Sequence, residues 1–126
     1  MQRTKKQTYY PLPFPPQGRT SAKRGLLMIL VRNVFQLKFG KAREALAVMK
    51  EGAAIQKRLG AEGSPRLLTD LTGRHYTLVL EMTVPNLAAF EAMAPRIFGD
   101  KEFQANYQKM VPLVESGHRE IFTIVE

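Results

Sequence analysis

Hydrophobic and polar residues alternate along residues 29–39 with a period of two. One face carries Ile29, Val31, Asn33, Phe35, Leu37 and Phe39, and the other carries Arg32, Gln36 and Lys38. Because successive side chains of a strand point to opposite faces, this pattern predicts a β-strand that is half buried. Gly40 would end it.

The period changes to that of a helix over residues 42–59. Apolar and small side chains recur every three or four residues and form one stripe: Ala45, Val48, Gly52, Ile55 and Leu59. This spacing predicts an amphipathic helix, and Gly60 suits the left-handed residue just beyond its end. Gly52 weakens a helix, so its place in the stripe predicts close packing of this helix on a sheet.

Two further strands are predicted at residues 66–72 and 75–84. Between them, Thr72-Gly73-Arg74 is a tight turn, and the second strand alternates apolar and polar side chains up to Pro85. Short turns between alternating segments are typical of antiparallel hairpins.

The last part of the chain predicts a broken helical region and a fourth strand. A first helix from Leu87 would stop at Pro95, which cannot donate a backbone hydrogen bond. A second helix would begin after Asp100, reach about residue 115 and kink near Pro112. Alternation then predicts a strand over residues 118–125.

The predicted order is β-α-β-β-α-β, which is the ferredoxin-like α+β arrangement with a four-stranded antiparallel sheet. The helices would cover one face of the sheet. The other face carries enough apolar side chains to form an exposed patch, and such patches mark interfaces. A homodimer that packs through this open sheet face is therefore expected, since two-fold dimers are the commonest oligomers.

The positive charge gathers at the start of the chain. The net charge is +8, and residues 1–27 hold six basic side chains and no acidic one, with four prolines near Phe14. We expect a disordered basic tail at 1–27 and one folded domain at 28–126. Three interpretations of the tail stay open: a start assigned upstream of Met28, a basic arm for an acidic partner, or a targeting peptide.

Several classes of function are disfavoured by the composition. Residues 28–126 are nearly neutral, with 13 basic and 11 acidic side chains, which argues against a nucleic-acid-binding face. Cysteine is absent and histidine occurs only twice, so we expect no metal site. No run of about 20 apolar residues is present, and we expect a cytoplasmic protein with no membrane partner. The glycine spacings of nucleotide-binding loops are also missing.

Three segments carry a family resemblance: RNVFQLKFGKA at 32–42, PRLLTDLTGRHYTLVLEMTV at 65–84 and HREIFTIVE at 118–126. The chain resembles the dimeric α/β-barrel superfamily, and within it the NIPSNAP-like and antibiotic-biosynthesis-monooxygenase-like proteins. The resemblance covers residues 28–126 and implies a homodimer with a cleft between sheet and helices. The cleft would take a small apolar or aromatic molecule, either for cofactor-independent or haem-using monooxygenation or for binding without catalysis.

Haem is the one cofactor that the resemblance raises. Related haem-degrading monooxygenases use an asparagine on the first strand, with a tryptophan and a haem-ligating histidine in the second helical region. Asn33 matches the first of these, Tyr107 stands at the histidine position, Met93 lies near the tryptophan position, and the chain has no tryptophan. We therefore expect no cofactor and keep haem as the alternative.

The candidate site residues follow from these patterns. Catalytic candidates are Asn33, a polar residue on an apolar strand face, Tyr107, and the two proton carriers His75 and His118. Candidates for an apolar ligand-binding lining are Phe35, Phe90, Met93, Phe98 and Phe103. Each has a structural alternative: Asn33 bonded to the protein itself, the aromatic and Met side chains in the core, and the histidines at the surface. Glu81 is expected to form an ion pair at the dimer interface, with Arg32 or Arg66, rather than to act as a base.

Overall fold

The computed structural model describes residues 27–61, 63 and 65–125 of the chain. The elements follow one another as β1 (Ile29–Leu37), α2 (Ala42–Arg58), β2 (Arg66–Thr69), β3 (Thr77–Val84), α3 (Leu87–Phe98), α4 (Lys101–Met110), a 3₁₀ turn (Val111–Leu113) and β4 (Val114–Thr123). This order confirms the predicted ferredoxin-like α+β fold. The expectations for a disordered tail fall on residues 1–26, outside the described part.

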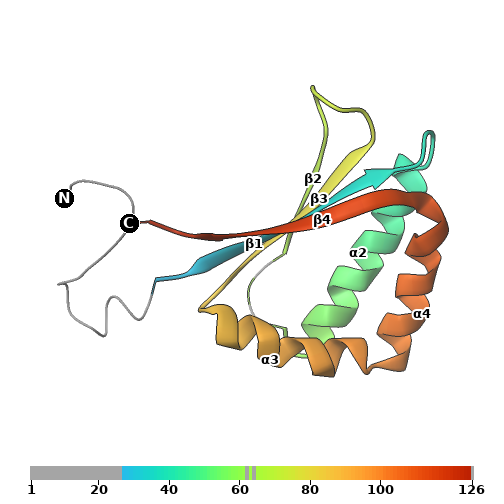
Figure 1. The fold of residues 1–126 in the computed structure, drawn as a ribbon. Coiled ribbons are helices and arrows are strands. Elements are labelled where there is room, and N and C mark those ends of the chain that lie inside the picture. The colour runs from blue at the N-terminus through green and yellow to red at the C-terminus, as the bar shows by residue number, and fades with distance from the viewer. Residues whose placement is uncertain (1–26, 62, 64, 126) are drawn as a thin grey trace.

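The four strands form one antiparallel sheet in the order β2-β3-β1-β4. All helices lie on one side of this sheet (Figure 1). The register places Asn33 of β1 beside Leu80 on β3 and Arg119 on β4, so these three residues share one face. By the same alternation, His118 and Glu120 belong to the other face. We call the two faces the helix-facing side and the open side.

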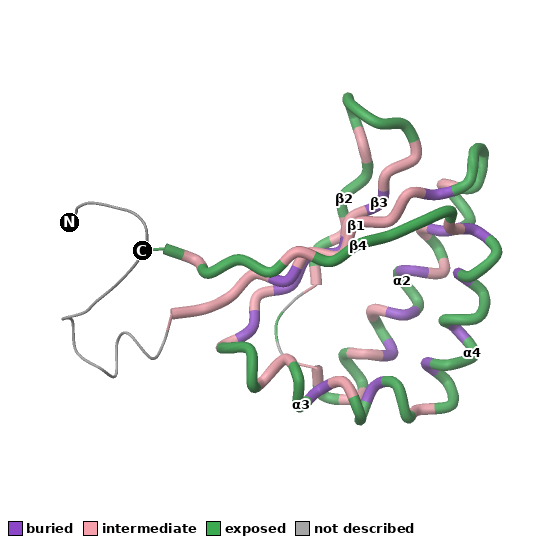
Figure 2. The backbone as a smooth tube through the Cα atoms, viewed as in Figure 1, coloured by how far each residue is buried: buried purple, intermediate pink, exposed green. Residues whose placement is uncertain are grey.

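The core lies between the helix-facing side and the helices. Its buried side chains come from every helix and from β1 and β3: Val31, Leu37, Ala45, Met49, Ile55, Leu78, Leu80, Met82, Val84, Met93, Ile97, Phe103, Met110 and Leu113. β4 differs, because most of its residues are exposed (Figure 2). The sheet is therefore covered at β1 and β3 and left accessible along the β4 edge.

Gly52 does meet a close neighbour, although the neighbour is another helix. A Cβ at this position would lie 2.7 Å from Oδ1 of Asn106 on α4. Asn106 is buried, and its Nδ2 donates to the Val48 carbonyl at 3.2 Å. The expected packing of Gly52 on a sheet is thus wrong: the glycine leaves room for the buried amide that joins α2 to α4.

Three strand ends differ from the prediction. β1 stops at Leu37 and leaves Phe39 exposed, β2 ends at Thr69 rather than at 72, and β3 begins at Thr77 rather than at 75. The cause at β3 is Tyr76, whose φ of 62° is in the left-handed region that an extended strand cannot include. Its carbonyl accepts from the Leu37 amide at 2.8 Å, so the bend also closes the end of β1.

The predicted break at Pro95 is wrong, because α3 runs through this residue to Phe98. Pro95 removes one hydrogen-bond donor from the helix, but its own carbonyl still accepts from the Gly99 amide at 3.0 Å. The chain turns instead at Gly99, where a Cβ would lie 2.8 Å from that carbonyl. Asp100 then caps α4 by accepting from the Phe103 amide at 2.9 Å, as predicted.

The fourth strand starts earlier than predicted. Pro112 lies in the short 3₁₀ turn, and β4 begins at Val114, four residues before His118. Ser116 and Gly117 are therefore strand residues and do not end a helix. Gly117 has a packing reason to be in the strand, since a Cβ there would lie 3.1 Å from the Phe35 ring. No helix of the described residues is long and apolar enough to span a bilayer.

Candidate functional site

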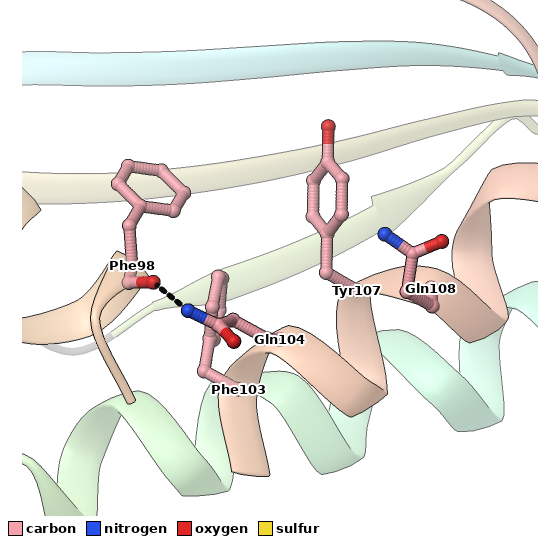
Figure 3. Close-up of a pocket in the computed structure, with 5 residues that line it drawn as sticks. All are labelled: Phe98, Phe103, Gln104, Tyr107 and Gln108. Atoms are coloured by element: carbon pink, nitrogen blue, oxygen red, sulfur yellow. Dashed lines mark hydrogen bonds between the residues drawn. The ribbon is translucent and has the colours of Figure 1, made fainter. Parts of the chain in front are cut away.

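A pocket with a volume of about 300 Å³ opens beside α4, at the corner where α3 ends. Five side chains line it: Phe98, Phe103, Gln104, Tyr107 and Gln108. Figure 3 shows the Phe98 and Tyr107 rings projecting from the helices toward the strands, with the hydroxyl of Tyr107 at the far end of its ring. The pocket thus has aromatic walls and three polar groups, which are the hydroxyl of Tyr107 and the side-chain amides of Gln104 and Gln108.

The aromatic residues of the pocket hold one another in place. The rings of Phe98 and Phe103 meet edge to face with centroids 5.5 Å apart, and Tyr107 lies 6.4 Å from Phe103. Phe103 is buried, whereas Phe98 is 52% exposed and Tyr107 is 54% exposed. The buried ring therefore supports two rings that keep about half of their surface free for a ligand.

The α3–α4 corner is fixed by the hydrogen bonds of its own residues. Besides the Asp100 cap, Nε2 of Gln104 donates to the Phe98 carbonyl at 2.7 Å (Figure 3). This bond ties the last residue of α3 to the first turn of α4. The Asp100 cap and the Gln104 bond therefore hold Phe98 in place relative to α4, on which Tyr107 lies.

A second polar group lies on the helix-facing side of the sheet. Nε of Arg119 on β4 donates to Oδ1 of Asn33 on β1 at 2.7 Å. The guanidinium also lies over the ring of Phe90 on α3, 5.2 Å from its centroid. The partner of Asn33 is therefore a side chain of the protein, as the structural alternative expected, while the amide Nδ2 has no hydrogen-bond partner in the described part of the chain.

The open side of the sheet carries a row of four charges that crosses all strands. Glu81 accepts from Nη2 of Arg66 at 2.7 Å and from Nε of Arg32 at 2.8 Å, and Arg32 lies 3.5 Å from Glu120. Glu81 is only 4% exposed. The hydrogen bonds from Arg66 and then Arg32 lower the pKa of the Glu81 carboxyl, and they outweigh its burial, which acts in the opposite direction. The predicted ion pairing of Glu81 is confirmed.

The structure does not bring the two histidines to the pocket. His75 is exposed in the β2–β3 hairpin, and His118 is exposed on the open side, where Nε2 lies 3.1 Å from Glu120. Of the predicted apolar lining, Phe98 and Phe103 line the pocket, Phe90 supports Arg119, Met93 is in the core, and Phe35 packs against that core. The catalytic roles of Asn33, Tyr107, His75 and His118 stay predictions.

The pocket does not fit haem well. A haem iron needs an imidazole, a thiolate, a thioether or a tyrosinate as axial ligand. No histidine lines the pocket, and within the described residues the Tyr107 hydroxyl has no hydrogen bond to a basic side chain. Nor does the described part contain a group of three His, Cys, Asp or Glu side chains that could hold a metal ion.

Arg119, Gln104 and Gln108 are site residues that the sequence alone did not single out. The alternation of residues 118–125 places Arg119 on the face opposite to His118, which was a usable signal. Which residue of β1 it would meet depends on the strand register, and the register shifts between Gln36 and Leu37. The structure was needed to join Arg119 to Asn33.

Comparisons with known proteins support the fold. No protein-family model matches this chain, and no curated protein matches it. Among solved structures, a NIPSNAP family protein of unknown function from Agrobacterium tumefaciens has a TM-score of 0.72 at 21% identity, over 79% of this chain and 89% of that one. A NIPSNAP-like domain protein from Burkholderia xenovorans gives 0.71 at 20% identity, over 79% and 87%.

A third similar structure has an assigned activity. SnoaB from Streptomyces nogalater, a cofactor-independent oxygenase, has a TM-score of 0.60 at 18% identity, over 79% of this chain and 95% of that one. At these identities the likeness concerns the fold and not the chemistry. The resemblance expected from the sequence is confirmed at that level: the chain has the ferredoxin-like fold that NIPSNAP family proteins and SnoaB share.

Proposed function

We propose that this protein is a homodimer that binds a small aromatic or apolar molecule in the pocket at the α3–α4 corner. The observation that carries the proposal is the pair of half-exposed rings, Phe98 and Tyr107, which border a hollow instead of packing into the core. Ligand pockets typically combine an apolar lining with a few placed polar groups. Here those groups are the hydroxyl of Tyr107 and the amides of Gln104 and Gln108.

The homodimer is supported by the composition of the open side. Apolar side chains surround the charge row on this face, and those of Leu68 and Phe122 are 39% and 46% exposed. The other apolar positions of the face, by register, are Leu30, Val34 and Val79. A second copy would cover them through a two-fold interface.

The binding proposal is tested with 4-phenylphenol, an elongated and neutral hydroxyarene. Its fluorescence can be followed because the protein contains no tryptophan. We expect saturable binding that weakens at least about fivefold in Phe98→Ala, because the ligand loses stacking surface worth about 1 kcal/mol or more. Phe39→Ala is the matched control, since Phe39 is an exposed ring beyond the end of β1 and lines no part of the pocket. Equal affinity of the two variants would refute the assignment of the pocket.

A second candidate function is metal-free oxygenation of such a ligand. It is favoured by the hydroxyl of Tyr107 in the pocket and by the activity of SnoaB, which shares the fold. In such a reaction an acidified CH₂ group and O₂ give a carbonyl and water, so that one oxygen atom enters the product and the other leaves with the two hydrogens. Hydrogen-bond donors assist by stabilising the substrate as an enolate.

The residues that line the pocket lead us to place the binding function first. Among the described residues, the lining includes no carboxylate and no imidazole that could remove the proton. An oxygen electrode separates the two functions, with 2-tetralone as substrate because its CH₂ lies between a ring and a carbonyl. We expect binding without oxygen uptake. Uptake that disappears in Tyr107→Phe would instead establish the oxygenase.

A further inference from the structure

Arg119 is a cation on the helix-facing side with no anion to neutralise it. In the described part of the chain no carboxylate lies within ion-pair distance of its guanidinium, and its contacts are Oδ1 of Asn33 and the Phe90 ring. The next residue, Glu120, points to the open side and pairs with Arg32 and His118. Arg119 does not itself line the pocket, but its charge is available to a ligand that extends from the pocket along the helix-facing side of the sheet.

The hydrogen-bonding capacity left in this group consists mainly of donors. A guanidinium has five N–H groups and an amide has two. The bond to Asn33 uses Nε–H of Arg119 and the amide oxygen, which leaves both Nη groups of Arg119 and Nδ2 of Asn33. Two adjacent groups that both present N–H bonds match an oxygen anion and not a neutral donor.

The two contacts also fix how the anion would be bound. Since Nε is engaged by Asn33, the edge formed by Nη1 and Nη2 is the one left for a bidentate partner. The Phe90 ring supports the flat face of the guanidinium from α3. A carboxylate has the spacing to accept from both Nη groups at once.

We propose that the ligand of this protein is an aromatic carboxylic acid, whose carboxylate binds Arg119 while its rings lie against Phe98 and Tyr107. This inference rests on the proposed binding function and narrows its ligand class. Phe90 and Phe98 are eight residues apart on α3, which is about 12 Å along a helix. The ligand is consequently elongated, with two or more rings.

The test compares biphenyl-4-carboxylate with biphenyl-4-carboxamide, which has nearly the same shape and no charge. Affinities are measured by calorimetry on the full chain, for the parent protein and for Arg119→Gln. We expect the carboxylate to bind the parent protein more tightly than the amide, and Arg119→Gln to weaken the carboxylate about tenfold or more while changing the amide less than twofold. The preference for the carboxylate should also shrink as salt is raised.

Control variants separate this role from a structural one. Arg74→Gln removes the same charge from the exposed β2–β3 hairpin and should leave both affinities unchanged. Asn33→Ala leaves Arg119 in place but removes its Oδ1 partner, and it should weaken the carboxylate by a smaller factor. Circular dichroism and gel filtration check that each variant folds.

The outcomes distinguish the two levels of the proposal. Equal binding of both probes to the parent protein, with no selective effect of Arg119→Gln, would overturn the carboxylate inference and leave the aromatic pocket standing. If neither these probes nor 4-phenylphenol bind, the proposed function fails and this inference fails with it.

Discussion

Glu81 offers the sharpest test of how this sheet is stabilised. The carboxylate is 4% exposed and accepts two charged hydrogen bonds, from Arg66 and from Arg32. Replacing it by Gln keeps its shape but removes the charge, and the new NH₂ group then faces a guanidinium. The perturbation therefore addresses the charge row with little change in packing.

The expected loss follows from the exposure of the two arginines. The Arg66 side chain is 72% exposed, so its bond counts as a surface ion pair worth up to about 1 kcal/mol. The Arg32 side chain is 36% exposed, and a hydrogen bond to a charged, buried group contributes about 1.5 kcal/mol or more. Together they predict that Glu81→Gln lowers the free energy of unfolding by about 2 kcal/mol. With a typical urea slope, the midpoint falls by about 1 M.

The same variant predicts a pH dependence with a definite sign. The folded-state pKa of Glu81 is depressed below its model value of 4.5. Its contribution is therefore fully present above the unfolded pKa and is lost as pH falls through the lower, folded pKa. We expect the stability difference between the parent protein and Glu81→Gln to be constant near neutral pH and to shrink below about pH 4.5.

The assay is urea unfolding at a fixed protein concentration, followed by circular dichroism at pH 7 and at pH 3. Glu51→Gln is the matched control, because Glu51 pairs with Lys109 at 3.2 Å and both side chains are about half exposed. Its cost should stay below about 0.5 kcal/mol. A Glu81→Gln variant as stable as this control, or a difference that does not change with pH, would refute the reasoning.

Three further predictions concern packing, assembly and domain limits. Gly52→Ala should destabilise the protein by about 1 kcal/mol, because the displaced Asn106 amide loses its bond. In an Asn106→Ala background the same change should stabilise the protein, because only the helix propensity of Ala remains. Thermal unfolding of the parent protein, the two single variants and the double variant gives the sign in each background. If the proposed dimer forms through the open side, Phe122→Asp should give a monomer in light scattering where the parent protein gives a dimer, and equal masses would count against that interface. Deletion of residues 1–26 should leave the circular dichroism spectrum unchanged and should leave the proposed dimer intact in light scattering. Loss of a dimer that the full chain forms would show that the tail takes part in assembly.

The sequence predicted the fold well because its signals are local and repeated. A period of two marked β1, β3 and β4, a period of 3.6 marked α2, turn and cap residues placed the other elements, and the resemblance agreed with them. The errors fell where one residue was judged without its context. Pro95 was taken as a break, yet a helix that gains stability by burying Met93 and Ile97 can lose one backbone hydrogen bond and continue.

The candidate site was less predictable because it depends on the register of distant strands. Asn33 was singled out as a polar residue on an apolar face, and this placement on the helix-facing side agrees with the structure. Its partner Arg119 lies 86 positions away, and a slip of one residue would have put Arg119 on the opposite face. No local pattern contains that information.

The sheet order also bears on how the chain folds during synthesis. β1 is a central strand, and its two neighbours are β3 and β4. β4 begins at residue 114, whereas β1 ends at residue 37. At typical rates of translation, β1 waits roughly 4 to 15 s before synthesis of β4 begins. During that time one edge of a central strand stays unpaired, so chaperone binding to nascent chains should be strongest before β4 emerges and should fall once it has.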